Sequence, residues 1–233
     1  MLKFLGIGNL FNTEFGNTSC YKEIGKNLLI IDVGTFALKP LIDSKIMLNK
    51  DNIFVYITHN HPDHIAGLGS LIFYAYYVLN KKIKIIYPMA SKQKSNITKF
   101  LSLQGISTIK YNIISEKQFS ISGIKELKCD RVKHSNLESF ALKIIYKDNK
   151  KDIFIGDNGD IDYIKKQASL IGKDDFIYTD VSLENLKSHL NLNSLSDVIE
   201  AKKRKNVVCV HFADHKTKLK AQELGFSVAN IEL

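Results

Sequence analysis

The sequence predicts an α/β protein in which two mixed β-sheets are stacked and helices cover both outer faces. Two observations predict this class. Short apolar runs rich in β-branched and aromatic residues alternate with segments of helical spacing along most of the chain. Strands dominate the middle of the chain, and the segments of helical spacing fall in pairs outside it. Two sheets between two layers of helices would bury the apolar faces of all these elements.

The first half of the chain is expected to supply a hairpin followed by strand–helix units. The turn at Gly25-Lys26-Asn27 predicts the hairpin. Pro40 is tolerated only near the start of a helix, so the helix around it must begin close to that residue. In chain order, the expected strands are 2–6, 19–24, 28–32, 53–57 and 83–87, and the expected helices are 36–48, 68–79 and 92–103.

The second half is expected to begin with four short strands and to continue with strands and helices in alternation. No linker, low-complexity tract or repeat divides the sequence, so we expect one domain over residues 1–233. The expected strands are 108–111, 118–121, 124–132, 140–146, 153–155, 176–181 and 207–210, and the expected helices are 161–171, 194–205 and 217–224.

Composition leaves the class of partner open. The 233 residues are 45% hydrophobic, which suffices for a well-buried core. The net charge is +9, but the basic residues are scattered rather than gathered in one block. This charge indicates either a lysine-rich solvated surface or attraction of a small anionic substrate such as a nucleotide.

Cysteine usage and the apolar runs bear on the cell compartment. Cys20, Cys129 and Cys209 are far apart and form neither a disulfide framework nor the spacing of a metal site. The first ten residues lack the long apolar region and cleavage site of a signal peptide, and the apolar run 68–79 is too short to span a bilayer. We therefore expect a cytoplasmic protein that does not associate with a membrane.

Three histidines and an aspartate follow the apolar run 53–57 within six consecutive positions: His59, His61, Asp63 and His64. The run predicts a buried strand, which would deliver all four side chains to one edge of a sheet. Burying so many polar groups on one tight loop is costly unless something pairs them, and a divalent cation does so. The loop therefore predicts a metal site.

Polar residues recur at the ends of other apolar strands. Asp32, His134, Asp157 and His211 each stand directly after such a strand. A single residue of this kind is more often a capped strand end than a ligand. Four of them beside the histidine loop indicate ligands that converge on one edge of the sheets and are held by rigid elements.

With these residues the chain resembles the metallo-β-lactamase fold superfamily. The matching motifs occur in the order of that family and span essentially the whole chain. They are Asp32 within Ile31-Asp32-Val33-Gly34-Thr35, the 59–64 loop, His134-Ser135, Gly156-Asp157, and His211. The resemblance implies an αββα sandwich with two divalent cations between the sheets.

The resemblance also implies a role for each residue. Asp32 would accept hydrogen bonds and orient the loop. Zn²⁺ is the expected metal, with Mn²⁺ or Fe²⁺ as alternatives, and a hydroxide bridging the two cations would be the nucleophile. His59, His61 and His134 would hold the first metal, Asp63, His64 and His211 the second, and Asp157 would bridge both.

His189, within Lys187-Ser188-His189-Leu190, indicates which branch of the superfamily the chain resembles. Together with the segment 178–184 it resembles the ribonuclease Z-like phosphodiesterases. Carried over from them, His189 would assist at the scissile phosphate as a proton donor or by stabilising its charge. Its acidic partner is either Asp180 or Glu184. We expect Asp63 and His189 to be the catalytic side chains.

The interval between His134 and Asp157 departs from true ribonuclease Z. Those enzymes carry a long Gly/Pro-rich arm there that grips tRNA, whereas this interval predicts a strand pair with a turn at 148–150. The missing arm favours a small phosphodiester. We therefore expect a dinuclear-metal phosphodiesterase that hydrolyses a cyclic nucleotide.

Other functions remain open at this point. The charge of +9 suits a ribonuclease Z-like RNA-processing endonuclease, which is the main alternative. A thioester or lactone hydrolase would use a similar metal site but would leave His189 without a role. A degenerate site would serve a ligand sensor or an interaction module. The resemblance also implies a homodimer.

Overall fold

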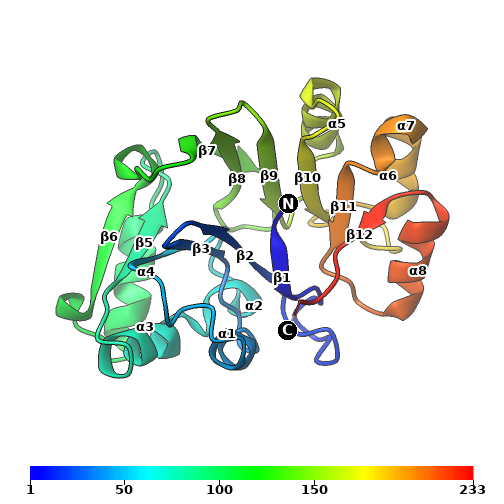
Figure 1. Cartoon of the computed structure of the whole chain (residues 1–233). Coiled ribbons are helices and arrows are strands. Elements are labelled where there is room, and N and C mark those ends of the chain that lie inside the picture. The colour runs from blue at the N-terminus through cyan, green and yellow to red at the C-terminus, as the bar shows by residue number, and fades with distance from the viewer. Residues whose placement is uncertain (233) are drawn as a thin grey trace.

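The computed structural model describes residues 1–232 and contains two six-stranded mixed sheets, one from each half of the chain (Figure 1). The first sheet has the order β1-β2-β3-β4-β5-β6, antiparallel from β1 to β3 and parallel from there on. Its strands are β1 (Lys3–Gly6), β2 (Ser19–Ile24), β3 (Asn27–Ile31), β4 (Asn52–Tyr56), β5 (Ile83–Tyr87) and β6 (Tyr111–Ser115).

The second sheet has the order β12-β11-β10-β9-β8-β7. It is antiparallel from β7 to β9 and parallel from β9 to β12. Its strands are β7 (Ile124–Val132), β8 (Ser139–Tyr146), β9 (Lys151–Gly156), β10 (Phe176–Asp180), β11 (Val207–Val210) and β12 (Ser227–Val228).

Helices cover the outer face of each sheet. On the first sheet lie α1 (Leu38–Asp43), α3 (Leu68–Tyr77) and α4 (Gln93–Leu103). On the second lie α5 (Ile161–Leu170), α6 (Leu192–Val198), α7 (Ala201–Arg204) and α8 (His215–Glu223) (Figure 1). One more turn, α2 (Pro62–Ile65), follows β4. None of the helices within residues 1–232 is long and apolar enough to cross a bilayer.

Strand β3 shows why the layers form. Leu29 and Ile31 belong to the core between the two sheets, whereas Leu28 and Ile30 belong to the core beneath α1, α3 and α4. Successive side chains of a strand point to opposite faces, so a strand that is apolar at every position needs cover on both sides. This arrangement confirms the predicted αββα sandwich of two mixed sheets.

Two predicted strands are wrong, because local side-chain bonds form turns there. Residues 108–110 form a 3₁₀ turn (η1) that begins after Ser107, whose hydroxyl accepts the N–H of Ile109; strand β6 begins only at Tyr111. Residues 116–118 form a second 3₁₀ turn (η2), capped by the side chains of Ser115 and Gln118, in place of a strand at 118–121. Such side-chain bonds compete with strand pairing.

Two predicted helices differ in extent. Helix α1 is shorter than 36–48, since Pro40 lies in its first turn and Lys45 has a φ of 56° just after its end. The predicted helix 194–205 is divided into α6 and α7 at Ile199, which is extended and 2% exposed. The Arg204 guanidinium donates to the carbonyls of Ser196 and Ile199 at the break, so their backbone acceptors stay satisfied.

Candidate metal centre

The strand ends that face one edge of both sheets bring the predicted ligands together. Strands β3, β4, β9, β10 and β11 end at this edge. The donor atoms form two groups, each within 4.8 Å of one another, and Asp157 belongs to both. The first group is His59, His61, His134 and Asp157; the second is Asp63, His64, His211 and Asp157.

Local backbone geometry places the histidine loop. His61 occupies the N-cap position of α2, and Pro62 occupies the first helical position, where its missing N–H costs nothing. Asp63 and His64 therefore lie on one short turn rather than on an irregular loop. The segment after β3 lies against this turn: a Cβ on Gly34 would come within 2.0 Å of the Asp63 carbonyl oxygen. Only glycine allows that approach.

Three residues at the strand ends have left-handed backbone conformations. Asp32 has a φ of 60° and His211 a φ of 62°, which are uncommon for residues with a side chain. Gly156, with a φ of 70°, precedes Asp157, and a Cβ there would press on the Thr58 side chain. Such conformations turn the chain sharply at the strand ends that carry Asp32, Asp157 and His211.

Asp32 fixes the orientation of two histidines. Its carboxylate accepts from the Thr58 N–H at 2.7 Å, from the Thr58 hydroxyl at 2.8 Å and from Nδ1 of His64 at 2.8 Å. Because the Thr58 hydroxyl gives its proton to Asp32, it accepts from Nδ1 of His59 at 3.1 Å. Nε2 of His59 is therefore left unprotonated and available to a metal, and Nε2 of His64 is the ring nitrogen left free of Asp32.

His134 is held in the same way by a backbone carbonyl. Its Nδ1 donates to the Ser188 oxygen at 2.9 Å, so its Nε2 carries a lone pair. That Nε2 lies 3.0 Å from Nδ1 of His61, and Nε2 of His59 lies 2.9 Å from the same atom. Three nitrogens at this spacing cannot all be joined by hydrogen bonds, because two of them have no proton to give.

Two buried ligand atoms of the site have no hydrogen-bond partner within residues 1–232, which further supports the binding of cations. Among the described residues, Nε2 of His64 and Oδ1 of Asp157 are buried and have no hydrogen-bond partner. Leaving such atoms unpaired is costly. Imidazole nitrogens with a few carboxylate oxygens form the donor set of Zn²⁺ and of related divalent cations. The residues present therefore fit two metal ions.

The protonation states mostly suit metal binding. Burial lowers the pKa of His59 well below its usual value and also lowers the pKa of His134, so both are neutral. Burial raises the pKa of Asp157, but His211 and His64 outweigh this and hold that pKa well below its usual range. His64 differs: burial lowers its pKa, yet Asp157 and Asp32 raise it well above normal. Metal binding at His64 must therefore release a proton.

His189 stands beside these two groups and forms a third, smaller one with Asp157 and Asp180. Its Nδ1 lies 2.7 Å from the carboxylate of Asp180, which is fully buried at the end of β10. Of the two acidic partners that the sequence allows, the structure selects Asp180. The imidazole is stacked on His211, with ring centroids 5.3 Å apart, and 21% of the His189 side chain is exposed.

Two large hollows flank the metal centre. One, of about 480 Å³, opens on His189 and His211 and is also lined by Phe11 and by Leu186. The other, of about 610 Å³, opens on His134. Among the described residues that line it are three cations and no carboxylate: Arg131, Lys133 and Lys187. A substrate at the metals therefore meets different chemistry on its two sides.

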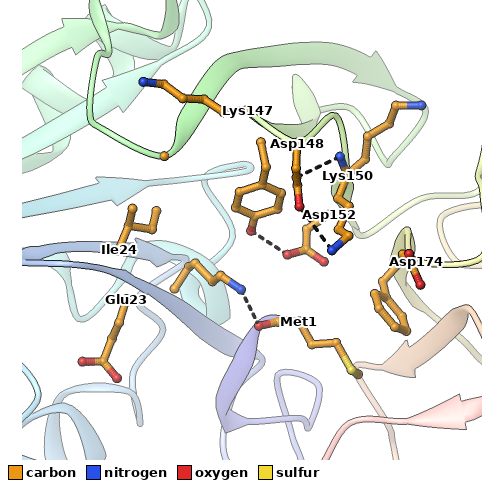
Figure 2. A pocket seen from close by; sticks show the side chains of 13 residues that line it. Met1, Glu23, Ile24, Lys147, Asp148, Lys150, Asp152 and Asp174 are labelled. Carbon is orange, nitrogen blue, oxygen red and sulfur yellow. Dashed lines mark hydrogen bonds and ion pairs between the residues drawn. The ribbon is translucent and has the colours of Figure 1, made fainter.

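A third hollow, of about 570 Å³, lies at the opposite end of the same strands, where β9 and β10 begin (Figure 2). Four lysines and four carboxylates line it, so their formal charges cancel. The Asp152 carboxylate on its wall accepts the hydroxyls of Tyr146 at 2.6 Å and Tyr178 at 3.0 Å, and Lys150 pairs with Asp148. Among the residues that the structure describes, this hollow brings together no group of imidazoles and carboxylates like the one at the metal edge.

Two residues of the site were not assigned a role from the sequence. Thr58 stands next to His59 and relays the orientation set by Asp32, and the Ser188 carbonyl orients His134. The first could have been suspected from its position between strand and loop. The second could not, since any residue supplies a carbonyl.

Known proteins resemble this chain over nearly its whole length. A curated relative, the anti-Pycsar protein Apyc1 of Bacillus phage 010DV004, is 22% identical over 236 residues, covering 92% of this chain and 89% of the relative. The short form of human tRNase Z has a TM-score of 0.70 at 17% identity, covering 100% and 97% of the two chains. The metallo-β-lactamase fold protein YhfI of Bacillus subtilis has a TM-score of 0.73 at 17% identity, covering 99% and 95%.

The two solved structures confirm the metallo-β-lactamase fold. The family model described as anti-Pycsar protein Apyc1 matches residues 1–229, and the chain belongs to that family.

Proposed function

We propose that the protein hydrolyses a cyclic nucleotide. Two divalent cations would be held by the seven residues of the two donor groups, and His189 would act at the phosphate. The chain is a metal-dependent hydrolase of the phosphodiesterase type. Anti-Pycsar proteins degrade cyclic nucleotides, which supports that substrate class here. The observation that carries the proposal is the position of His189, oriented by Asp180 and stacked on the candidate ligand His211.

The side chains divide the work. Cations held in this site supply Lewis acidity and an activated water for attack on phosphorus. Asp180 fixes Nδ1 of His189, so Nε2 is the atom that faces the substrate. We assign to this Nε2 the transfer of a proton to the oxygen that leaves phosphorus when the cyclic ester opens. Asp63 is proposed to hold the second cation and to keep His211 in place, since its Oδ2 lies 3.1 Å from Nε2 of His211.

The shape of the site supports a small substrate. Strands β8 and β9 form an antiparallel pair joined by a short turn, and this occupies the interval in which ribonuclease Z carries its arm. The hollow of about 480 Å³ beside His189 has the size of a typical small-molecule site.

A turnover screen tests the proposal. Protein loaded with Zn²⁺ or Mn²⁺ is incubated with cyclic mononucleotides, cyclic dinucleotides and precursor tRNA, and metal content is measured on the same sample. We expect opening of the cyclic mononucleotide ring to a linear monophosphate. Metal-loaded protein that leaves every cyclic nucleotide intact would overturn the proposal.

The basic hollow beside His134 favours one other candidate, an RNA-processing endonuclease. Arg131, Lys133 and Lys187 could neutralise phosphates of an RNA chain that extends from the metals. Cleavage of 3′ trailers from precursor tRNA, with binding that weakens steeply as salt is raised, would favour this candidate over the cyclic nucleotide.

A further inference from the structure

We propose that Phe11 is the surface on which the base of the substrate stacks, an inference that rests on the proposed cyclic-nucleotide activity. Phe11 lies in the loop between β1 and β2, beside the metal edge. Its side chain lines the same hollow as His189 and His211.

Exposure sets Phe11 apart from the other apolar residues. It is 83% exposed, the highest value among the large hydrophobic side chains within residues 1–232. Single exposed apolar residues are common on proteins and need no explanation by themselves. Phe11 differs because it lines the same hollow as the candidate ligand His211, whereas Leu103, which is 80% exposed, lies at the end of α4.

Hydrogen bonds hold the loop that carries Phe11 in place. The side chain of Asn9 accepts the N–H groups of Phe11 and Asn12 at 3.0 and 3.1 Å. The Asn12 amide donates to the carbonyls of Phe212 and Ala213, both at 3.2 Å. These two residues directly follow the candidate ligand His211. The backbone of the loop that carries Phe11 is therefore tied to the segment directly after the candidate ligand His211.

The chemistry of the two hollows orients the substrate. The charged residues that line the hollow beside His134 are three cations. Among the described residues, those that line the hollow with Phe11 are two carboxylates and one cation: Glu184, Asp214 and Lys216. The anionic phosphate is attracted to the metals and to the basic side. A base is uncharged and has an aromatic face, so it is accommodated on the other side. A rigid ring there offers stacking at little entropic cost.

Stacking of a base on an aromatic ring has a measurable effect on binding and does not depend strongly on which base is bound. Removing an aromatic residue that stacks on a base costs about 5- to 150-fold in binding. The platform would accept purines and pyrimidines alike, because every base has a π-face.

The test compares two substrates that differ only in the base. Hydrolysis of a cyclic nucleotide and of base-less ribose 3′,5′-cyclic phosphate is measured with wild type, Phe11→Ala, Phe11→Trp and the control Tyr77→Ala, whose exposed ring lies at the end of α3. We expect Phe11→Ala to lower kcat/KM for the nucleotide about 10- to 100-fold, mainly through KM, and to change the base-less substrate less than about twofold. Phe11→Trp should restore the nucleotide value, and Tyr77→Ala should match wild type.

The outcomes separate this inference from the proposed function. If wild type opens cyclic nucleotides but Phe11→Ala lowers both substrates equally, or neither, stacking on Phe11 is overturned and the proposed function stands. If metal-loaded wild type opens neither substrate, the proposed function fails and the inference fails with it. Thermal unfolding of each variant shows whether an equal loss reflects misfolding.

Discussion

Nδ1 of His189 lies 2.7 Å from the carboxylate of Asp180, a group that no solvent reaches. A carboxylate so placed fixes both the tautomer and the direction of the imidazole. Neither residue is needed to complete the set of candidate ligands, so the pair is available for proton transfer. Its properties lead to the first two predictions.

Replacing His189 with Ala should lower kcat by about 10²- to 10⁴-fold and leave the metal content unchanged, because the imidazole acts on the substrate rather than on the cations. Steady-state kinetics and elemental analysis on one sample check both parts. His215→Ala is the matched control, since this exposed histidine pairs with Glu14 at 2.8 Å and lines neither flanking hollow. Loss of metal from His189→Ala would show that His189 is a ligand instead.

Replacing Asp180 with Asn should move the alkaline limb of the pH–rate profile to lower pH. Burial raises the pKa of Asp180 to about 6, and the hydrogen bond from His189 opposes this rise. Burial lowers the pKa of His189, but the Asp180 carboxylate outweighs this and raises it. The pair thus keeps a proton to higher pH, and activity that needs this proton is lost as pH rises through the pKa of the pair.

The sign of the shift follows from the carboxylate. Without it, burial still lowers the pKa of His189 and only the Asp157 and Asp63 carboxylates oppose this, so His189 loses its proton at a lower pH. The profile of kcat/KM against pH measures the effect in both enzymes. An alkaline limb that stays in place, or that moves to higher pH, would contradict a proton-donating His189.

Replacing Asp157 with Asn should remove metal and reduce turnover by about 10³-fold or more, since Lewis-acid activation of the nucleophile is lost. Asp157 is the residue shared by both donor groups, and its Oδ1 is buried without a partner within residues 1–232. Asp148→Asn, an exposed carboxylate paired with Lys150, is the control. Equal metal content in the two variants would argue against a bridging carboxylate.

The candidate site was more predictable from the sequence than some of the elements around it. Asp157 and His211 follow strands that are buried along nearly their whole length, so the ends of these strands had to meet at one edge. In contrast, the turns at 108–110 and 116–118 depend on hydroxyl and amide bonds that outweigh a weak strand pattern. The break at Ile199 depends on Arg204, which reaches it from the next helix.

Asp180 and Glu184 illustrate the remaining limit. Both precede His189 closely, and the sequence could not choose between them. The choice is made by β10, which ends at Asp180 and buries its carboxylate beside the imidazole, whereas Glu184 lies beyond the strand and lines the hollow. The spacing along the chain does not reveal which of the two carboxylates is buried beside the imidazole.

Replacing Asp32 with Asn should weaken metal affinity about 10- to 100-fold at both donor groups. The substitution turns one accepting oxygen into an NH2 group, so either the Thr58 N–H or the pair formed by the Thr58 hydroxyl and Nδ1 of His64 loses its acceptor. Thr58→Val separates the two groups. It removes the hydroxyl that orients His59 but leaves the bond between Asp32 and His64 intact, so only the first group should weaken. Competition with a chromophoric chelator, read as two release steps, measures both. If Thr58→Val weakened both steps as much as Asp32→Asn does, the hydroxyl relay to His59 would be wrong, and Asp32 would act by holding the fold of the loop.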